Sequence, residues 1–144
     1  MTVLFATLLA VFLGDQAIKL LLRRRLGERA IALGAFGNVR TVAGRLWVRR
    51  LRPHWSGAAL WCLWLAAAIA LVIGSWWVPS SGVFAGLLLG GSLSHAVESS
   101  LSGGITDYIC LRFWPAFDLA DVAITAGTIG TVGMHLISKG ATVF

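Results

Sequence analysis

Charged residues are scarce in this sequence. Asp, Glu, Lys and Arg together account for 12% of its 144 residues, whereas hydrophobic residues account for 58%. With a mean hydropathy of +0.83, this composition excludes an ordinary water-soluble domain and is typical of a chain that lies largely within a bilayer. Residues 1–144 are interpreted as a single membrane domain, so a functional site must be built inside its helix bundle or on the connecting segments.

Cysteine is almost absent. The two cysteines, Cys62 and Cys110, form neither a CxxC motif nor a Cys/His ligand pattern, so the sequence predicts no disulfide and no cysteine-bound metal. Acidic residues are also few, six against twelve basic ones, which gives a net charge of +6. An excess of basic residues can indicate nucleic-acid binding, but its distribution along the chain decides which partner is expected.

Most of the basic residues lie in one segment between hydrophobic runs. Clustering of this kind beside a membrane span favours phospholipid headgroups as the partner and not nucleic acid. The cluster consists of nine arginines: Arg23, Arg24, Arg25, Arg29, Arg40, Arg45, Arg49, Arg50 and Arg52.

Four apolar stretches are long enough to cross about 30 Å of hydrocarbon as helices. They cover about residues 2–22, 55–78, 83–101 and 117–138. The tryptophans at both ends of the second stretch, Trp55, Trp76 and Trp77, fit the aromatic belts of a membrane interface. The sequence therefore predicts an all-α integral membrane protein with a bundle of four transmembrane helices.

The connecting segments differ in character. Residues 31–53 alternate apolar and polar side chains in places, which predicts a short strand pair or an interfacial element, and residues 79–82 predict a tight turn. Residues 102–115 are expected to form a loop. With four spans, the loop 102–115 and the arginine-rich segment lie on the same membrane face, and the positive-inside rule would place that face in the cytoplasm.

Carboxylates within or beside the spans are costly unless they are paired or hydrated, so each needs an explanation. Asp15 and Lys19 have the i, i+4 spacing of a helical ion pair, and we predict a structural role for them. Glu98 has several serines near it in sequence and is open to hydrogen bonds with them. Asp118 directly precedes the apolar part of the fourth span and is a candidate N-cap.

Asp107 and Asp121 form the most interesting pair, because the predicted topology brings both to one membrane face. Two neighbouring carboxylates do not ionise together easily, so one keeps a proton while the other can activate water, as in aspartic peptidases. Helix capping and buried hydrogen bonding remain alternative roles for both residues.

His95 and Glu98 stand i, i+3 on one face of the third span. With Asp107 and Asp121 they could form a metal site with nitrogen and oxygen ligands. A hydrogen-bonded His/Glu pair without metal is the alternative.

Three segments of the chain match motifs of a known family. Residues 90–109, GGSLSHAVESSLSGGITDYI, follow the pattern GGxLGNxxDR…GxVxDxI; residues 117–124, FDLADVAI, follow FNLADxxI; and residues 15–19, DQAIK, follow DQxxK. On these motifs the sequence resembles the lipoprotein signal peptidases, or signal peptidase II, the membrane-embedded aspartic peptidases of bacteria.

The resemblance implies a function and a site. Asp107 and Asp121 would be the catalytic dyad that cleaves a lipidated peptide before its lipid-modified cysteine, without a metal or organic cofactor. Residues 31–53 would form a small extramembrane β-cradle on the membrane. The protein would be a multi-pass, monomeric protein of the bacterial inner membrane, with its active site on the non-cytoplasmic face. Four further residues would form the supporting shell of the dyad: His95, Glu98, Ser99 and Asp118.

The same four positions depart from the family motifs. The motif Asn is His95, the motif Asp is Glu98, the motif Arg is Ser99, and the Asn of FNLAD is Asp118. The family's NxGaaF element is not recognisable in residues 38–47. Two alternative functions follow: a non-catalytic descendant that binds a lipopeptide or a partner protein, and a metal-dependent membrane enzyme that uses His95 and Glu98.

Overall fold

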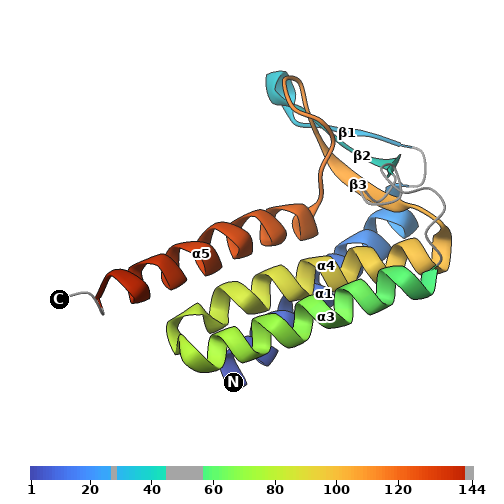
Figure 1. Cartoon of the computed structure of the whole chain (residues 1–144). Helices are drawn as coiled ribbons and strands as arrows, with labels where there is room; N and C mark the ends of the chain where they lie inside the picture. The colour runs from blue at the N-terminus through green and yellow to red at the C-terminus, as the bar shows by residue number, and fades with distance from the viewer. Residues whose placement is uncertain (27–28, 45–56, 142–144) are drawn as a thin grey trace.

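The computed structural model describes residues 1–26, 29–44 and 57–141. Four long helices and a small sheet make up this part of the chain (Figure 1). The helices are α1 (Thr2–Leu26), α3 (Gly57–Trp77), α4 (Gly82–Ser102) and α5 (Leu119–Ala141). The shorter elements are β1 (Ile31–Ala32), the 3₁₀ turn η1 (Gly34–Phe36), β2 (Gly37–Gly44), the 3₁₀ turn η2 (Pro79–Ser81) and β3 (Ile105–Leu111).

All four helices are long and apolar enough to cross a membrane. Large apolar side chains such as Leu13, Ile69 and Ile129 are exposed on the helices, as expected where lipid and not water is the neighbour. The predicted four-helix membrane fold is confirmed. The first helix is longer than predicted, because it continues to Leu26 and includes Arg23, Arg24 and Arg25 in its last turn, where positive charge complements the helix dipole.

Helix α4 is central, since it packs against α1, α3 and α5. Its contact with α1 depends on glycine: a Cβ at Gly86 would lie 2.6 Å from the Leu4 carbonyl oxygen, and a Cβ at Gly90 would lie 2.6 Å from the Leu8 oxygen. Such small residues allow two helix backbones to approach closely in a membrane. The buried residues Leu4, Ala85 and Leu89 fill the space beside them.

The sheet has the order β1-β2-β3 with antiparallel pairing throughout. Its third strand corrects a prediction, because residues 105–111 were expected to be loop. The run ITDYICL is rich in β-branched and aromatic residues, and it pairs with β2 through Val39 opposite Ile109 and Val42 opposite Asp107, with a bulge between these pairs. Asp107 is therefore held on a strand.

The strands predicted within residues 31–53 are present as β1 and β2, which end at residue 44. Residues 45–53 of that segment lie outside the described residues, and so does Trp55. Because β2 pairs with β3, the segments that follow α1 and α4 meet at one end of the bundle, as predicted (Figure 1). The predicted turn at residues 79–82 is the 3₁₀ turn η2, followed directly by α4.

Candidate active site

A buried ion cluster lies where α1, α4 and α5 meet near the sheet. Lys19 Nζ is 2.8 Å from Asp15 Oδ2, 2.8 Å from Glu98 Oε2 and 2.5 Å from Asp118 Oδ2. All four side chains are at most 4% exposed. The predicted ion pair of Asp15 and Lys19 is present, but the same lysine also binds a carboxylate on α4 and that of the residue just before α5. We call Asp15, Lys19, Glu98 and Asp118 the buried ion cluster.

The Glu98 side chain bonds to cations, whereas the sequence suggested hydrogen bonds to the neighbouring serines. Besides Lys19, its carboxylate accepts hydrogen bonds from Arg23 and from the backbone N–H of Thr106, the latter at 3.1 Å. The Ser102 hydroxyl donates to the backbone carbonyl of Glu98 and not to its carboxylate. Glu98 thus ties the end of α4 to α1 and to the first residues of β3.

Asp118 and Asp121 begin α5 together. The Asp121 N–H donates to Asp118 Oδ1 at 2.8 Å, and the Asp118 N–H donates to Asp121 Oδ2 at 3.3 Å. This reciprocal pairing is a capping box, which satisfies two backbone donors at the helix start. The predicted N-cap role of Asp118 is confirmed. The two acids nevertheless differ in environment, since Asp118 is fully buried whereas the Asp121 side chain is 43% exposed.

Two residues that sequence reasoning did not select connect the sheet to this cluster. The Tyr108 hydroxyl accepts a 3.0 Å hydrogen bond from the N–H of Leu119 and lies 3.5 Å from Asp15 Oδ1. Arg23 donates to Thr106 Oγ1 at 2.6 Å as well as to Glu98. Tyr108 is 5% exposed, and no pattern in residues 105–111 indicates which of their side chains are buried.

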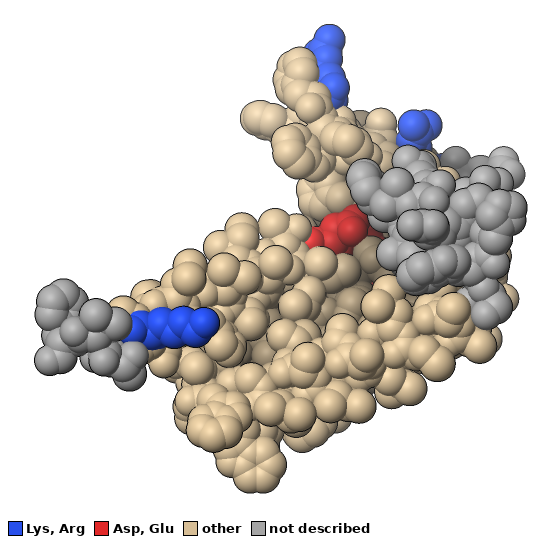
Figure 2. All heavy atoms as spheres, viewed as in Figure 1, with Lys and Arg blue, Asp and Glu red and all other residues tan. Residues whose placement is uncertain are grey.

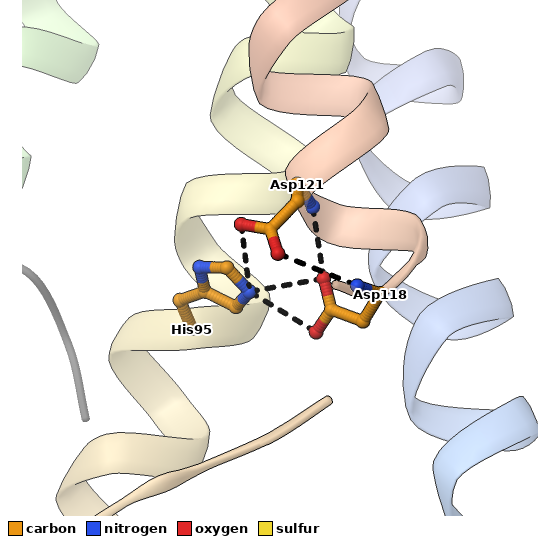
Figure 3. A group of neighbouring side chains, drawn as sticks. All are labelled: His95, Asp118 and Asp121. Carbon is orange, nitrogen blue, oxygen red and sulfur yellow. Dashed lines mark hydrogen bonds and ion pairs between the residues drawn. The ribbon is translucent and has the colours of Figure 1, made fainter. Parts of the chain in front are cut away.

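His95 contacts the start of α5 (Figure 3). Its Nε2 lies 3.2 and 3.1 Å from the two carboxylate oxygens of Asp118 and 3.9 Å from Asp121 Oδ1. Within the described chain, the residues whose ligand atoms gather closely enough for a metal are His95, Asp118 and Asp121, all within 4.8 Å of one another. Glu98 does not belong to this group, so the suggested ligand set of His95, Glu98, Asp107 and Asp121 is not the one that the structure assembles.

The suggested hydrogen bond between His95 and Glu98 is also not the contact that these residues make, because each bonds a different neighbour. His95 bonds Asp118 near the start of α5, and Glu98 bonds Lys19 on α1. Ser99, the remaining residue of the predicted shell, lines a neighbouring cavity, and its buried hydroxyl has no hydrogen-bond partner among the described residues.

A cavity of about 670 Å³ adjoins this group, between α3, α4, α5 and the sheet. Asp107 from β3 and Asp121 from α5 both line it, together with His95. On the face shown in Figure 2, acidic atoms reach the surface in one place, where the sheet meets the helices. The rest of the wall is mainly apolar and includes Leu60, Trp61, Leu63, Trp64, Ala67, Leu71, Leu88, Leu89, Ala96, Ile105, Pro115, Ala116 and Ile124.

Asp107 has an altered acidity. Burial raises its pKa from the ordinary 3.8 to about 6, and the negative charges of Asp118 and Asp121 contribute to the rise. A carboxyl group that is partly buried beside other carboxylates keeps its proton because ionisation there is opposed by both lost hydration and repulsion. Asp107 can therefore supply a proton at a pH where an ordinary aspartate is ionised.

Four membrane-spanning helices that carry a sheet and an acid-lined cavity at one end have counterparts of known structure. Two solved chains, each described as a bacterial membrane enzyme structure obtained by the in meso method, have the same fold. One has a TM-score of 0.75 and 18% identity and covers 92% of this chain and 91% of its own. The other has a TM-score of 0.74 and 21% identity and covers 96% and 90%.

Residues 7–137 match the sequence profile of the family described as Signal peptidase (SPase) II. The chain belongs to this family. Relatives named lipoprotein signal peptidase include one from Xylella fastidiosa (strain 9a5c), 34% identical over 52% of this chain and 53% of its own length, and one from Methylorubrum extorquens (strain PA1), 35% identical over 53% and 50%. The alignments thus span about half the length of these relatives.

Proposed function

We propose that this protein is a membrane-embedded aspartic endopeptidase that cleaves a lipidated or hydrophobic peptide, with Asp107 and Asp121 as its acid and base. The observation that carries the proposal is the placement of both carboxylates on the wall of one cavity. The other described acids, Asp15, Glu98 and Asp118, are held by the buried cation Lys19. The cavity carboxylates, Asp107 and Asp121, are therefore the acids that remain accessible to a substrate.

The environments of the two acids suggest how they divide the reaction. Asp107, with its raised pKa, holds the shared proton, and Asp121 is ionised. Asp121 removes a proton from a water molecule as the water oxygen attacks the scissile carbonyl carbon, and Asp107 gives its proton to the carbonyl oxygen. Collapse of the tetrahedral intermediate then breaks the C–N bond: the leaving nitrogen takes a proton from Asp121, and Asp107 takes back a proton from one hydroxyl of the intermediate as the C=O bond re-forms.

The cavity wall supports a hydrophobic substrate. Trp61 and Trp64 line it and donate their indole N–H groups to the hydroxyls of Ser100 and Ser92, each at 3.0 Å. The polar edge of each ring is thus satisfied within the protein. A lipid chain or an apolar peptide segment can cover such a wall without leaving these N–H groups unpaired.

The proposal includes a location. The chain would lie in the bacterial inner membrane as a monomer, among phospholipids whose headgroups the arginines contact. The site would face away from the cytoplasm, as the family resemblance implies, with some arginines bound to phosphates of the lipid or the substrate.

The test is to purify Asp107→Asn and Asp121→Asn and to measure cleavage of a synthetic lipidated prolipoprotein peptide in detergent micelles. Each amide keeps the shape of the side chain but cannot exchange the proton, so we expect turnover to fall by about 10² to 10⁴-fold in each variant while the folded state persists. Thr128→Ala, an exposed change further along α5, is the matched control and should cleave normally. Full turnover in both aspartate variants would refute the proposal.

The same assay separates the alternatives. If the unaltered protein binds the lipopeptide but never cleaves it, the non-catalytic binding function replaces the peptidase. If cleavage requires an added divalent metal and is abolished by a chelator, the metal-dependent enzyme replaces it, with His95, Asp118 and Asp121 as the ligand group that the structure favours.

A further inference from the structure

The group of His95, Asp118 and Asp121 has a geometry close to that of a first-row metal site. Ligand atoms that each lie about 2.0–2.2 Å from a tetrahedral ion are about 3.4 Å apart. His95 Nε2 is 3.2 Å from Asp118 Oδ1, the oxygen other than the one nearest Lys19, and 3.9 Å from Asp121 Oδ1, which brackets this value. The three ligand atoms lie within 4.8 Å of one another, and a small rotation of the partly exposed Asp121 would close the remaining gap.

The electrostatics of this end of the bundle favour another cation. In the described part of the chain, Lys19 is shared among Asp15, Glu98 and Asp118. Asp121 has no cation within ion-pair distance among these residues other than His95, if that ring is protonated, at 3.9 Å. Lys19 is thus shared by three carboxylates, and Arg23 pairs with one of them, Glu98. An ion next to Asp118 and Asp121 would offset negative charge that these two cations leave uncompensated.

The ligands arise where the sequence departs from the family motifs. His95 and Asp118 both stand at positions where the motifs have Asn, and neutral amides are weaker ligands for transition metals than an imidazole and a carboxylate. The two changes meet in space as the contact between His95 and Asp118. The adjoining cavity gives the site access to water, which can fill the fourth position of a tetrahedral ion.

We propose that His95, Asp118 and Asp121 bind a divalent transition-metal ion of the Zn²⁺ class, and that the bound ion inhibits the enzyme. An ion that occupies Asp121 Oδ1 engages the lone pair that would otherwise accept a proton from water. Binding of the ion depends only on the three side chains. Inhibition, in contrast, rests on the proposed function of Asp121, so the two are measured separately.

Binding is tested on purified, tag-free protein in detergent by titration with Co²⁺ followed by visible absorption, and with Zn²⁺ followed by calorimetry. We expect one ion per chain with a tetrahedral Co²⁺ spectrum. His95→Asn should weaken binding by about tenfold or more, because it removes the nitrogen ligand. The chain has three histidines, so His54→Asn and His135→Asn are matched controls that should bind as the unaltered protein does.

Two results would overturn the binding site: no saturable binding by the unaltered protein, or unchanged binding by His95→Asn. If His95→Asn does not fold, His95→Gln is the second variant, and X-ray absorption of the Zn²⁺-loaded unaltered protein must show one imidazole nitrogen with oxygen ligands at about 2.0–2.2 Å.

Inhibition is tested by adding Zn²⁺ to the peptide-cleavage assay, with each variant compared with its own metal-free rate. We expect Zn²⁺ to suppress cleavage by the unaltered protein and by His135→Asn at concentrations that leave His95→Asn at its own metal-free rate. Activation by Zn²⁺, or equal inhibition of all three proteins, would overturn the inhibitory role. Because the Co²⁺ titration needs no cleavage, failure of the peptidase proposal leaves the binding result interpretable.

Discussion

The buried ion cluster and the cavity carboxylates lie at the same end of the bundle, but in the described part of the chain the acids of the cluster are paired with a lysine and those of the cavity are not. In the cluster, Lys19 holds three acids away from solvent. At the cavity, Asp107 and Asp121 have no lysine or arginine within ion-pair distance among the described residues and face open space. Asp118 and Asp121 stand one helical turn apart, yet one is fully buried and the other 43% exposed. Similar carboxylates thus hold helices together in one place and line an open cavity in the other.

Removal of Lys19, the cation that the buried acids share, should cause the largest loss of stability. Lys19→Met leaves Asp15, Glu98 and Asp118 buried without their lysine, and loss of one partner from a buried ionic group costs about 3–5 kcal/mol. We expect a large fall in thermal stability in detergent micelles, measured by tryptophan fluorescence. Arg24→Met, an exposed change on the same helix, is the control and should change little. Equal melting temperatures for the two variants would show that the cluster contributes nothing to stability.

The raised pKa of Asp107 makes the stability of the folded protein depend on pH. The unfolded carboxyl ionises near 3.8, whereas the folded one keeps its proton until about pH 6. The folded state therefore binds the additional proton between these values, so Asp107 makes stability fall as pH rises from about 4 to 6. Asp107→Asn removes this titration. The melting temperature of the variant minus that of the unaltered protein should therefore increase over this range and level off above it; a difference that does not vary with pH would contradict the assignment.

The same pKa predicts a limit on activity. When Asp107 ionises above about pH 6, the proposed dyad would lose its shared proton, so kcat/KM for the lipidated peptide should decline as pH rises through this region.

Arg23 should show the smallest effect. It bonds Glu98 and Thr106, but its side chain is 47% exposed, and ion pairs that water can reach contribute about 0.2–1 kcal/mol. Arg23→Gln should lower the melting temperature only slightly, and high salt should reduce the difference. A loss as large as that of Lys19→Met would place Arg23 within the buried cluster and not at its edge.

Local features were predictable from the sequence, and contacts between distant segments were not. Hydrophobic length predicted the four spans, and i, i+4 spacing predicted the pair of Asp15 and Lys19. The contact between Lys19 and Glu98 joins residues 79 positions apart, and nothing in the sequence near either residue indicates it. The run ITDYICL has a local preference for a strand, but its partner strand β2 follows a different helix, so the sheet that holds Asp107 was not predicted.

The motif resemblance recovered what spacing left open. Topology suggested Asp107 and Asp121 as a pair, the resemblance implied a catalytic role for it, and the structure places both residues on one cavity. The resemblance could not indicate that His95 faces Asp118 while Glu98 faces Lys19. These two side chains are three residues apart on one helix, and their partners depend on how α1 and α5 pack around α4.

The glycines of α4 have a consequence beyond close packing, because they set the alignment of two helices along their length. The Leu4 and Leu8 carbonyl oxygens face Gly86 and Gly90, so backbone meets backbone at two successive levels. Sliding α1 by one turn would shift it by about 5.4 Å, well beyond the 2.8 Å contact of Lys19 with Glu98. The glycines therefore fix the axial position of α1 relative to α4 near the first turns of α1. This position determines which carboxylates Lys19 meets near the opposite end of α1.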